Sequence, residues 1–349
     1  MKTYGIIMAG GGGTRFWPLS TRELPKQFLN LSGKDIMINE TFDRLLGVVE
    51  QEDIFVVTNM EQVHLVHSMT GDRFRRDHIL SESAARNTAA CIGYAAIEIM
   101  EKYGDGIMCI VPSDHFIKDR GEFQNILKQG VEIADKTDRL VTIGIQPTFP
   151  STGYGYIQHD EIREGSAYVV KEFVEKPDVE TAKGYLEQGD YLWNSGMFIW
   201  KVSVILDYFK RLLPDIYQSL QEIQETFGKE DELEAIQKIY PTIPKISIDY
   251  GIMERADHVV VLPADFGWND VGSYDALDSI MDKDENENIR IGQTIAKKTT
   301  NCIVYTTDKL IATIGIQDLV IAQTENAVLV CAKECVQEVK SIVETLEKI

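Results

Sequence analysis

Cysteine is scarce in this chain, and basic residues are outnumbered by acidic ones. The five cysteines among 349 residues form no C-x-x-C pair and are odd in number, so we expect neither a disulfide framework nor a zinc site. Lysine and arginine total 35 against 55 aspartates and glutamates, which gives a net charge of −20. A nucleic-acid partner normally requires a basic surface, and we therefore expect none.

Long apolar runs are also missing from the sequence. No stretch approaches the roughly 20 apolar residues that span a bilayer. Met1-Lys2-Thr3 leads directly into a short apolar run, without the features of a signal peptide. We expect a cytoplasmic protein with no membrane partner.

Short apolar runs alternate with segments of helical spacing through the first part of the chain. The runs occupy 4–9, 54–57, 107–111 and 140–143, and apolar residues recur on one helical face in 88–103 and 123–133. This alternation predicts βαβ units, and hence an α/β fold with a mostly parallel sheet and flanking helices. In such sheets ligands bind beyond the carboxyl ends of the strands.

The charged run 282–288 is the best candidate for a domain boundary. Short β-rich segments follow it, and from about Glu334 the spacing predicts a terminal helix with Val336, Val339, Val343 and Leu346 on one face. An apolar helix and short edge strands are compatible with a homodimer.

The strongest chemical signal is the glycine run that ends the first predicted strand. Gly10, Gly11, Gly12 and Gly13 are followed by Thr14 and Arg15. Glycines let successive backbone N–H groups approach an anion closely, and the arginine fork suits phosphate oxygens. No Gly-Lys-Ser/Thr follows, and Phe16 stands where a dinucleotide fingerprint has its third glycine. A glycine-rich turn with an incidental arginine remains the alternative.

The segment 9–28 resembles the signature of the nucleotidyltransferase family that makes nucleoside-diphosphate sugars. Phe-Trp-Pro-Leu-Ser at 16–20 and Pro-Lys-Gln-Phe at 25–28 look most like its mannose-1-phosphate guanylyltransferase branch. Further matches follow in family order: Glu-Ser-Ala-Ala-Arg-Asn-Thr at 82–88, Pro-Ser-Asp-His at 112–115, Gly-Tyr-Gly-Tyr-Ile at 153–157, Phe-Val-Glu-Lys-Pro at 173–177, Trp-Asn-Ser-Gly-Met-Phe at 193–198, Ile-Asp-Tyr-Gly-Ile-Met-Glu at 248–254 and Gly-Trp-Asn-Asp-Val-Gly-Ser at 267–273.

The resemblance covers nearly the whole chain and implies two domains. The first, 1–283, would be a Rossmann-like nucleotidyltransferase catalytic domain. The second, 284–349, would be a small β-rich, left-handed β-helix-like domain with a C-terminal helix. Ser83 and Arg86 depart from the branch, which usually has proline and lysine at these positions of the base-recognition loop.

The resemblance also assigns roles to individual residues. It implies that Arg15, Lys26 and Lys176 are catalytic cations, and that Asp114 and Asp270 hold Mg²⁺, a cation that prefers oxygen ligands. The nucleotide would be bound by Gly10, Gly11, Gly12, Gly13, Thr14, Glu82, Asn87 and Thr88. The sugar phosphate would be bound by Gly153, Glu175, Lys176 and Asn194.

The expected reaction transfers GMP from GTP to mannose 1-phosphate, forming GDP-mannose and pyrophosphate by in-line attack at the α-phosphorus. A carboxylate such as Glu82 suits guanine, because the N1–H and N2–H₂ groups of that base are both donors. Two alternatives remain: the same chemistry with another base or sugar, and a non-catalytic paralogue that binds sugar nucleotides and regulates a partner.

Overall fold

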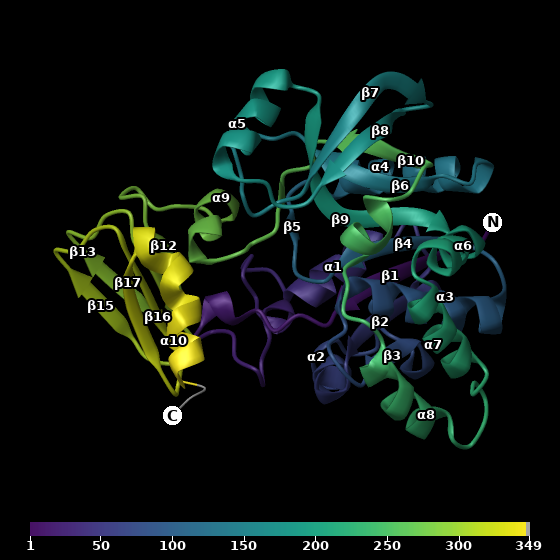
Figure 1. Ribbon diagram of the computed structural model, residues 1–349. Coiled ribbons are helices and arrows are strands. Elements are labelled where there is room, and N and C mark those ends of the chain that lie inside the picture. Colours follow the sequence, from purple (N-terminus) through teal and green to yellow (C-terminus); the bar gives the residue numbers. More distant parts are fainter. Residues whose placement is uncertain (347–349) are drawn as a thin grey trace. The chain divides into compact units, whose positions relative to one another are not determined.

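The computed structural model describes residues 1–346 and divides into two compact units (Figure 1). Unit 1 comprises Met1–Gly10, Thr41–Pro112 and Asp119–Phe266. Unit 2 comprises Gly11–Glu40, Ser113–Lys118 and Gly267–Ile349. Both units are therefore assembled from segments far apart in the sequence, so the boundary expected at 283 remains a prediction. Residues 347–349 of the predicted second domain lie outside the described residues.

Unit 1 is organised around one large sheet. Its strands are β1 (Thr3–Ala9), β2 (Ile54–Asn59), β3 (Ile79–Glu82), β4 (Ile107–Pro112), β6 (Leu140–Ile145), β7 (Tyr156–Glu164), β8 (Ala167–Val174), β9 (Tyr191–Lys201) and β10 (Val259–Ala264). They lie in the order β3-β2-β1-β4-β9-β6-β10-β8-β7. The strands β3, β2, β1, β4, β6 and β10 run in one direction, whereas β9 and β8 run against them. The expected α/β class with a mostly parallel sheet is confirmed.

Side chains that point alternately to the two faces of this sheet pack against helices on both sides. Tyr4 and Ile6 of β1 join a core cluster with residues of α3, whereas Gly5, on the opposite face, has room for Leu45 of α1. Figure 1 shows α3, α6 and α7 gathered together, and the helices make direct contacts. The helices are α1 (Met37–Leu45), α2 (Val63–Met69), α3 (Asn87–Tyr103), α4 (Arg120–Lys136), α5 (Val179–Gln188), α6 (Val202–Leu212), α7 (Pro214–Gln224), α8 (Glu232–Ile239), α9 (Leu277–Ile280) and α10 (Val339–Leu346).

Unit 2 contains small sheets. A two-stranded sheet pairs β5 (Phe116–Ile117) with β11 (Trp268–Asn269), and a second pairs β13 (Thr294–Lys297) with β15 (Ile311–Ile314). The remaining sheet has the order β12 (Ile289–Ile291), β14 (Ile303–Thr306), β16 (Leu319–Gln323) and β17 (Val328–Ala332). The β12–β14–β16 and β13–β15 ladders are parallel. Parallel stacking of successive short strands is the arrangement of a β-helix, as expected.

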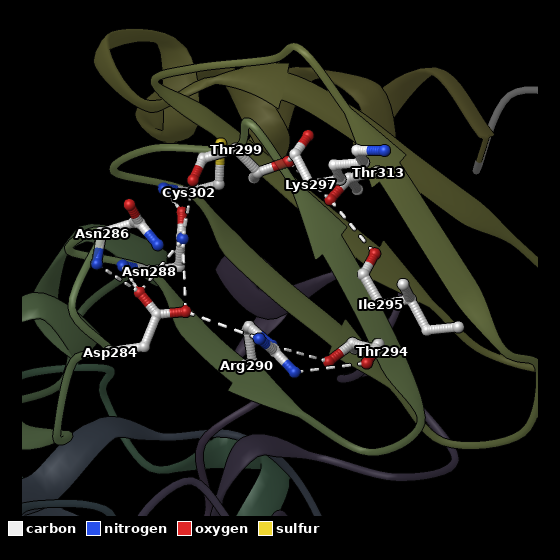
Figure 2. A network of polar contacts seen from close by, with 10 residues as sticks. All are labelled: Asp284, Asn286, Asn288, Arg290, Thr294, Ile295, Lys297, Thr299, Cys302 and Thr313. Atoms are coloured by element: carbon white, nitrogen blue, oxygen red, sulfur yellow. Dashed lines mark hydrogen bonds and ion pairs between the residues drawn. The ribbon is translucent and has the colours of Figure 1, made fainter.

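The charged run at 282–288 is an ordered turn that begins this stack. The side-chain amide of Asn288 donates to Asp284 Oδ1 (3.1 Å) and to the Thr299 carbonyl (2.9 Å), and its oxygen accepts from the Cys302 N–H (3.0 Å), as Figure 2 shows. Asn288 is only 1% exposed. The buried amide therefore joins the turn to the next coil of the β-helix-like stack.

The terminal helix forms, but it starts later than its apolar spacing suggests. A 3₁₀ segment, η9 (Lys333–Glu338), precedes α10. Val336 and Val339 are buried, but Leu346 is 48% exposed, so Leu346 does not belong to the buried face. Val336 of η9 and Val339 of α10 belong to one core cluster, so the expected apolar face is kept at the start of the helix and is lost at its end.

Candidate active site

The glycine run leads into a short 3₁₀ turn, η1 (Thr14–Phe16), whose preceding residue Gly13 has φ 55°. A Cβ atom at Gly13 would stand 2.9 Å from the Lys26 backbone nitrogen and still closer to Lys26 Cβ. Glycine is thus needed here for both its conformation and its lack of a side chain. The Ser20 hydroxyl donates to the Gly13 carbonyl and fixes the loop against this segment.

Lys26 is a buried lysine, not the solvated surface residue that its type usually is. It opens η2 (Lys26–Phe28) and is only 5% exposed. Its ammonium donates to Asp114 Oδ2 (3.0 Å) and to the Asp270 carbonyl (2.6 Å). Three residues predicted from separate motifs are therefore brought together by one side chain.

Asp114 is half-buried two residues beyond the end of β4. Burial by itself would raise its pKa, but the charges of Lys26 and His115 and the hydrogen bond from Lys26 outweigh it, so the pKa of Asp114 lies below its usual value. The carboxyl is consequently ionised at neutral pH and suited to a cation.

Arg15 and Asp270 approach each other across Gly272. A Cβ atom on Gly272 would lie 3.2 Å from Asp270 Oδ2 and 3.5 Å from Arg15 Nη1. Val271, between Asp270 and Gly272, has φ 49°, a rare conformation for a β-branched residue. Its N–H donates to Asn269 Oδ1 (2.7 Å), and its side chain is buried. Packing thus holds a strained backbone beside a predicted metal ligand, a common feature of functional sites.

These residues surround a cavity of about 340 Å³. It is lined by Gly13, Thr14, Arg15, Phe16, Lys26, Asp114, His115, Asp270, Gly272 and Lys340. The Trp268 indole N–H donates to His115 Nδ1 (3.1 Å), which orients that ring. Basic side chains and two carboxylates around one cavity, beside a glycine of the loop, are suited to a polyphosphate with a divalent cation.

Within residues 1–346 there is no group of three or more histidine, cysteine, aspartate or glutamate side chains that could hold a metal ion. Asp114 and Asp270 nevertheless fit Mg²⁺, because this ion usually takes one or two carboxylates and completes its coordination with water and substrate phosphates. The donor set therefore suits a metal that arrives with a phosphate substrate.

Glu82 closes β3 in unit 1 and is buried. It accepts a hydrogen bond from the Tyr240 hydroxyl, and its other oxygen would lie 2.8 Å from a Cβ atom on Gly10. Burial raises the pKa of Glu82 to about 7, although the Tyr240 hydrogen bond acts in the opposite direction. Gly10 therefore leaves the space that this carboxylate occupies.

Asn87 and Thr88 are the first two residues of α3. Asn87 has φ 68°, and its side-chain oxygen accepts from the Thr88 N–H (2.8 Å). The Thr88 hydroxyl accepts from the Ile248 N–H (2.9 Å), which fixes the start of the 248–254 motif. Thr88 thus has a structural role in addition to any contact with a nucleotide.

Glu175 and Asn194 converge in unit 1 around Gly155. A Cβ atom on Gly155 would collide with Glu175 Oε2 and would lie 3.4 Å from Asn194 Cβ. Lys176, with φ 49°, pairs with Glu175. The N–H of Gly153, the glycine predicted from the sequence, donates instead to Ser151 Oγ (3.2 Å). Gly155, which the sequence analysis did not select, is the glycine that makes room for Glu175.

Asp249 completes this cluster and was also missed as a site residue. It opens a π-helical turn, η7 (Asp249–Met253), and accepts from Asn194 Nδ2 (2.8 Å). Burial and, next, the charge of Glu175 raise the pKa of Asp249 to about 6. The 248–254 motif by itself indicates no role for Asp249 beyond a place in the wall of a sugar pocket. Only the fold brings this carboxylate to Asn194.

Comparison with known proteins agrees with this geometry. The family model described as nucleotidyl transferase matches residues 4–287. The chain belongs to this family. A second family model, described as the MannoseP isomerase/GMP-like beta-helix domain, matches residues 292–346, which include β13 to β17 and α10 of unit 2.

Curated relatives place the chain among the mannose-1-phosphate guanylyltransferases. It is 38% identical to mannose-1-phosphate guanylyltransferase ManC of Salmonella typhimurium strain LT2, over 99% of this chain and 73% of that protein. It is 36% identical to mannose-1-phosphate guanylyltransferase of Escherichia coli strain K12, over 99% of this chain and 74% of that protein. A solved structure, named mannose-1-phosphate geranyltransferase from Thermus thermophilus, matches 99% of this chain and 100% of its own with TM-score 0.90 and 34% identity.

Among the described residues, no helix is both long and apolar enough to cross a membrane.

The family found by these comparisons and the enzyme class, a nucleotidyltransferase, are those expected from the motifs.

Proposed function

We propose that this nucleotidyltransferase transfers GMP from GTP to mannose 1-phosphate, releasing pyrophosphate and forming GDP-mannose. The observation that carries the proposal is the cavity of unit 2, where Arg15, Lys26, Asp114 and Asp270 lie beside the glycine loop. Its residue types match a triphosphate with Mg²⁺, and the names of the relatives supply the class of base and sugar.

In the proposed reaction, a phosphate oxygen of mannose 1-phosphate attacks the α-phosphorus of GTP. A new P–O bond forms to that oxygen, the α–β bridging P–O bond breaks, and its electron pair leaves with pyrophosphate. No general base is needed, because the attacking phosphate oxygen is already ionised near neutral pH. The protein's contribution is therefore positioning and neutralisation of charge.

Different residues of the chain would position the substrates and neutralise their charge. Arg15, Lys26 and the N–H groups of the glycine loop would bind the triphosphate oxygens, while Lys26 also keeps Asp114 ionised. Mg²⁺ held by Asp114 and Asp270 would neutralise charge on the phosphates during transfer. Glu82 would accept from guanine, Lys176 would bind the sugar phosphate, and Glu175 with Asn194 would bind ring hydroxyls.

The test is pyrophosphate release in a cross of GTP, ATP, dTTP and UTP against mannose 1-phosphate and glucose 1-phosphate, with Mg²⁺ and with EDTA. We expect a clear maximum for GTP with mannose 1-phosphate, and loss of turnover with EDTA. A maximum for another pair would overturn the base or sugar assignment alone. Silence across the whole panel would favour the non-catalytic paralogue, and undiminished turnover in EDTA would overturn the role of Mg²⁺.

A further inference from the structure

The terminal helix α10 is fastened beside the glycine loop. Val339, its first residue, is buried in the same core cluster as Phe16 of η1. Just before the helix, Gln337 Nε2 donates to Ser273 Oγ (2.6 Å). The helix also packs directly against η1. The first turn of α10 is thus held in place relative to the loop by both apolar and polar contacts within unit 2.

Lys340 is the next residue, and it lines the same cavity as Arg15, Lys26 and the two carboxylates. Its side chain is 62% exposed, and its ammonium lies 3.7 Å from Glu344 Oε1. An exposed pair at this spacing on one helix contributes only about 0.5 kcal/mol or less. A phosphate ligand, which bears more charge and more acceptor oxygens than one carboxylate, would therefore replace Glu344 readily.

We propose that Lys340 is a third polyphosphate-binding cation, which contacts the β- and γ-phosphates of the nucleotide and the pyrophosphate formed from them. This inference rests on the proposed function, because it assumes that the cavity receives a triphosphate. Lys340 shares the cavity with the glycine loop and Arg15, the groups assigned to the triphosphate. The segment after 284 thereby contributes a charge to the chemistry as well as packing to the fold.

A flexible exposed lysine suits the leaving group. Lys26 is buried and fixed by Asp114 and the Asp270 carbonyl, so its position is set before a ligand binds. Lys340 has the freedom to follow pyrophosphate as the α–β bond breaks, because its ammonium is a point charge on a four-carbon stem. The expected signature is therefore weaker binding of nucleoside triphosphate and pyrophosphate. Little change is expected for mannose 1-phosphate or for GDP-mannose, whose second phosphate comes from mannose 1-phosphate and not from the β-position of GTP.

The experiment compares Lys340→Gln and Lys340→Arg with Lys309→Gln in the full-length chain. Lys309 is a matched control, because it is another exposed lysine of unit 2 with a neighbouring acidic partner, Asp308 (2.8 Å), and it does not line the cavity. Forward assays give the KM for GTP and for mannose 1-phosphate. Reverse assays give the KM for pyrophosphate and for GDP-mannose. Thermal melts check that all variants fold.

We expect Lys340→Gln to raise the KM for GTP and pyrophosphate roughly tenfold, the scale of one charged hydrogen bond. The KM for mannose 1-phosphate and GDP-mannose should stay within twofold of the wild type, and Lys340→Arg should recover most of the loss. If Lys340→Gln behaves like Lys309→Gln, or if it weakens all four substrates equally, the assignment of Lys340 is wrong.

Direct titration with pyrophosphate and Mg²⁺ separates this inference from the proposed function. If the wild-type protein turns over no substrate pair but binds pyrophosphate, and Lys340→Gln weakens that binding, the role of Lys340 stands while the reaction does not. If the wild-type protein catalyses the reaction and Lys340→Gln binds pyrophosphate normally, the reaction stands and the role of Lys340 is refuted.

Discussion

Three motif residues that are not glycine adopt a left-handed backbone. They are Asn87 at the start of α3, Lys176 beside Glu175, and Val271 beside Asp270, with φ 68°, 49° and 49°. Each such residue costs free energy that the rest of the fold must offset, and the cost is greatest for the β-branched Val271. Left-handed residues in three separate motifs indicate that backbone geometry there is maintained for the position of the neighbouring side chains.

The raised pKa of Glu82 leads to a prediction for stability against pH. Its folded pKa is about 7, against an ordinary value of 4.5. The folded state therefore binds this proton more tightly than the unfolded state, so the stability it contributes is full below pH 4.5 and is lost as the pH rises to about 7. We expect wild type to lose about 3 kcal/mol more than Glu82→Gln between pH 4.5 and pH 8.

Urea denaturation at several pH values measures this difference. Glu234→Gln removes a carboxyl that is exposed in α8 and serves as the control, because it should follow the wild-type curve. Parallel curves for wild type and Glu82→Gln would contradict the raised pKa of Glu82.

Asp249 gives a second prediction at this scale. Asp249→Asn keeps the shape of the side chain but removes its negative charge, which lies beside Asn194 and Glu175. If Asp249 positions Asn194 and accepts from a ring hydroxyl, kcat/KM for mannose 1-phosphate should fall by at least tenfold, about 1.4 kcal/mol, while the KM for GTP is unchanged.

The same variant should be more stable than wild type at pH 8, since the pKa of Asp249, about 6 when folded, lies above its usual 3.8. Steady-state kinetics and urea denaturation test the two effects separately. A loss of activity accompanied by a loss of stability would mean that Asp249 is merely structural.

At the scale of elements, the β-helix-like stack depends on polar groups at its turns. Within this stack, Asn288 satisfies the Thr299 carbonyl and the Cys302 N–H, and Thr299 pairs with Thr313 (2.8 Å) in the next coil, as Figure 2 shows. Short strands make few ladder hydrogen bonds each, so the buried side chains between coils must satisfy the remaining backbone groups.

Asn288→Ala should therefore destabilise the protein by about 2–4 kcal/mol, because two buried backbone groups would lose their partners. Chemical denaturation gives the value. Asn286→Ala is the matched control: Asn286 is exposed and joins the same turn through its backbone N–H, which the substitution keeps. Equal effects of the two substitutions would show that burial of the Asn288 amide does not matter.

At the scale of the whole molecule, the predicted domains share one core. Within unit 2, Phe16 packs on Tyr274 (ring centroids 5.0 Å), and both belong to the cluster that contains Ile303 and Val320 of the stacked strands. The Tyr274 hydroxyl donates to the Phe16 carbonyl (2.9 Å). The loop that carries Arg15 is thus supported by residues from beyond position 283.

A chain truncated to 1–283 should therefore fail to bind GTP, even if its large sheet forms. Fluorescence or calorimetric titration with GTP measures this, with the full-length chain as reference. Two single substitutions test whether the shared core is the cause. Val320→Asp places a charge in that core, and Ile295→Asp is the control, because it places a charge at a side chain that is 56% exposed. Normal GTP binding by the truncated chain or by Val320→Asp would refute the shared-core argument.

Motif residues close together in the sequence were predictable, because local spacing determines them. The glycine loop and the α/β alternation follow from residue type and order, whereas the roles predicted for Lys26, Asp114 and Asp270 follow from the resemblance of their motifs to the family. Val56 and Val57 of β2, for example, belong to a run that alternates with helices, and the parallel sheet follows from that pattern.

What only the tertiary structure decided is which distant groups meet. The sequence by itself determined the family, the fold class and the phosphate-binding character of the loop, because these depend on short-range pattern and side-chain chemistry. It did not determine that Asp249 holds Asn194, that Gly155 makes room for Glu175, or that Lys340 lines the cavity of Arg15. These contacts join residues tens to hundreds of positions apart in the chain or depend on backbone conformation, and only the packing of distant elements against one another brings such groups together.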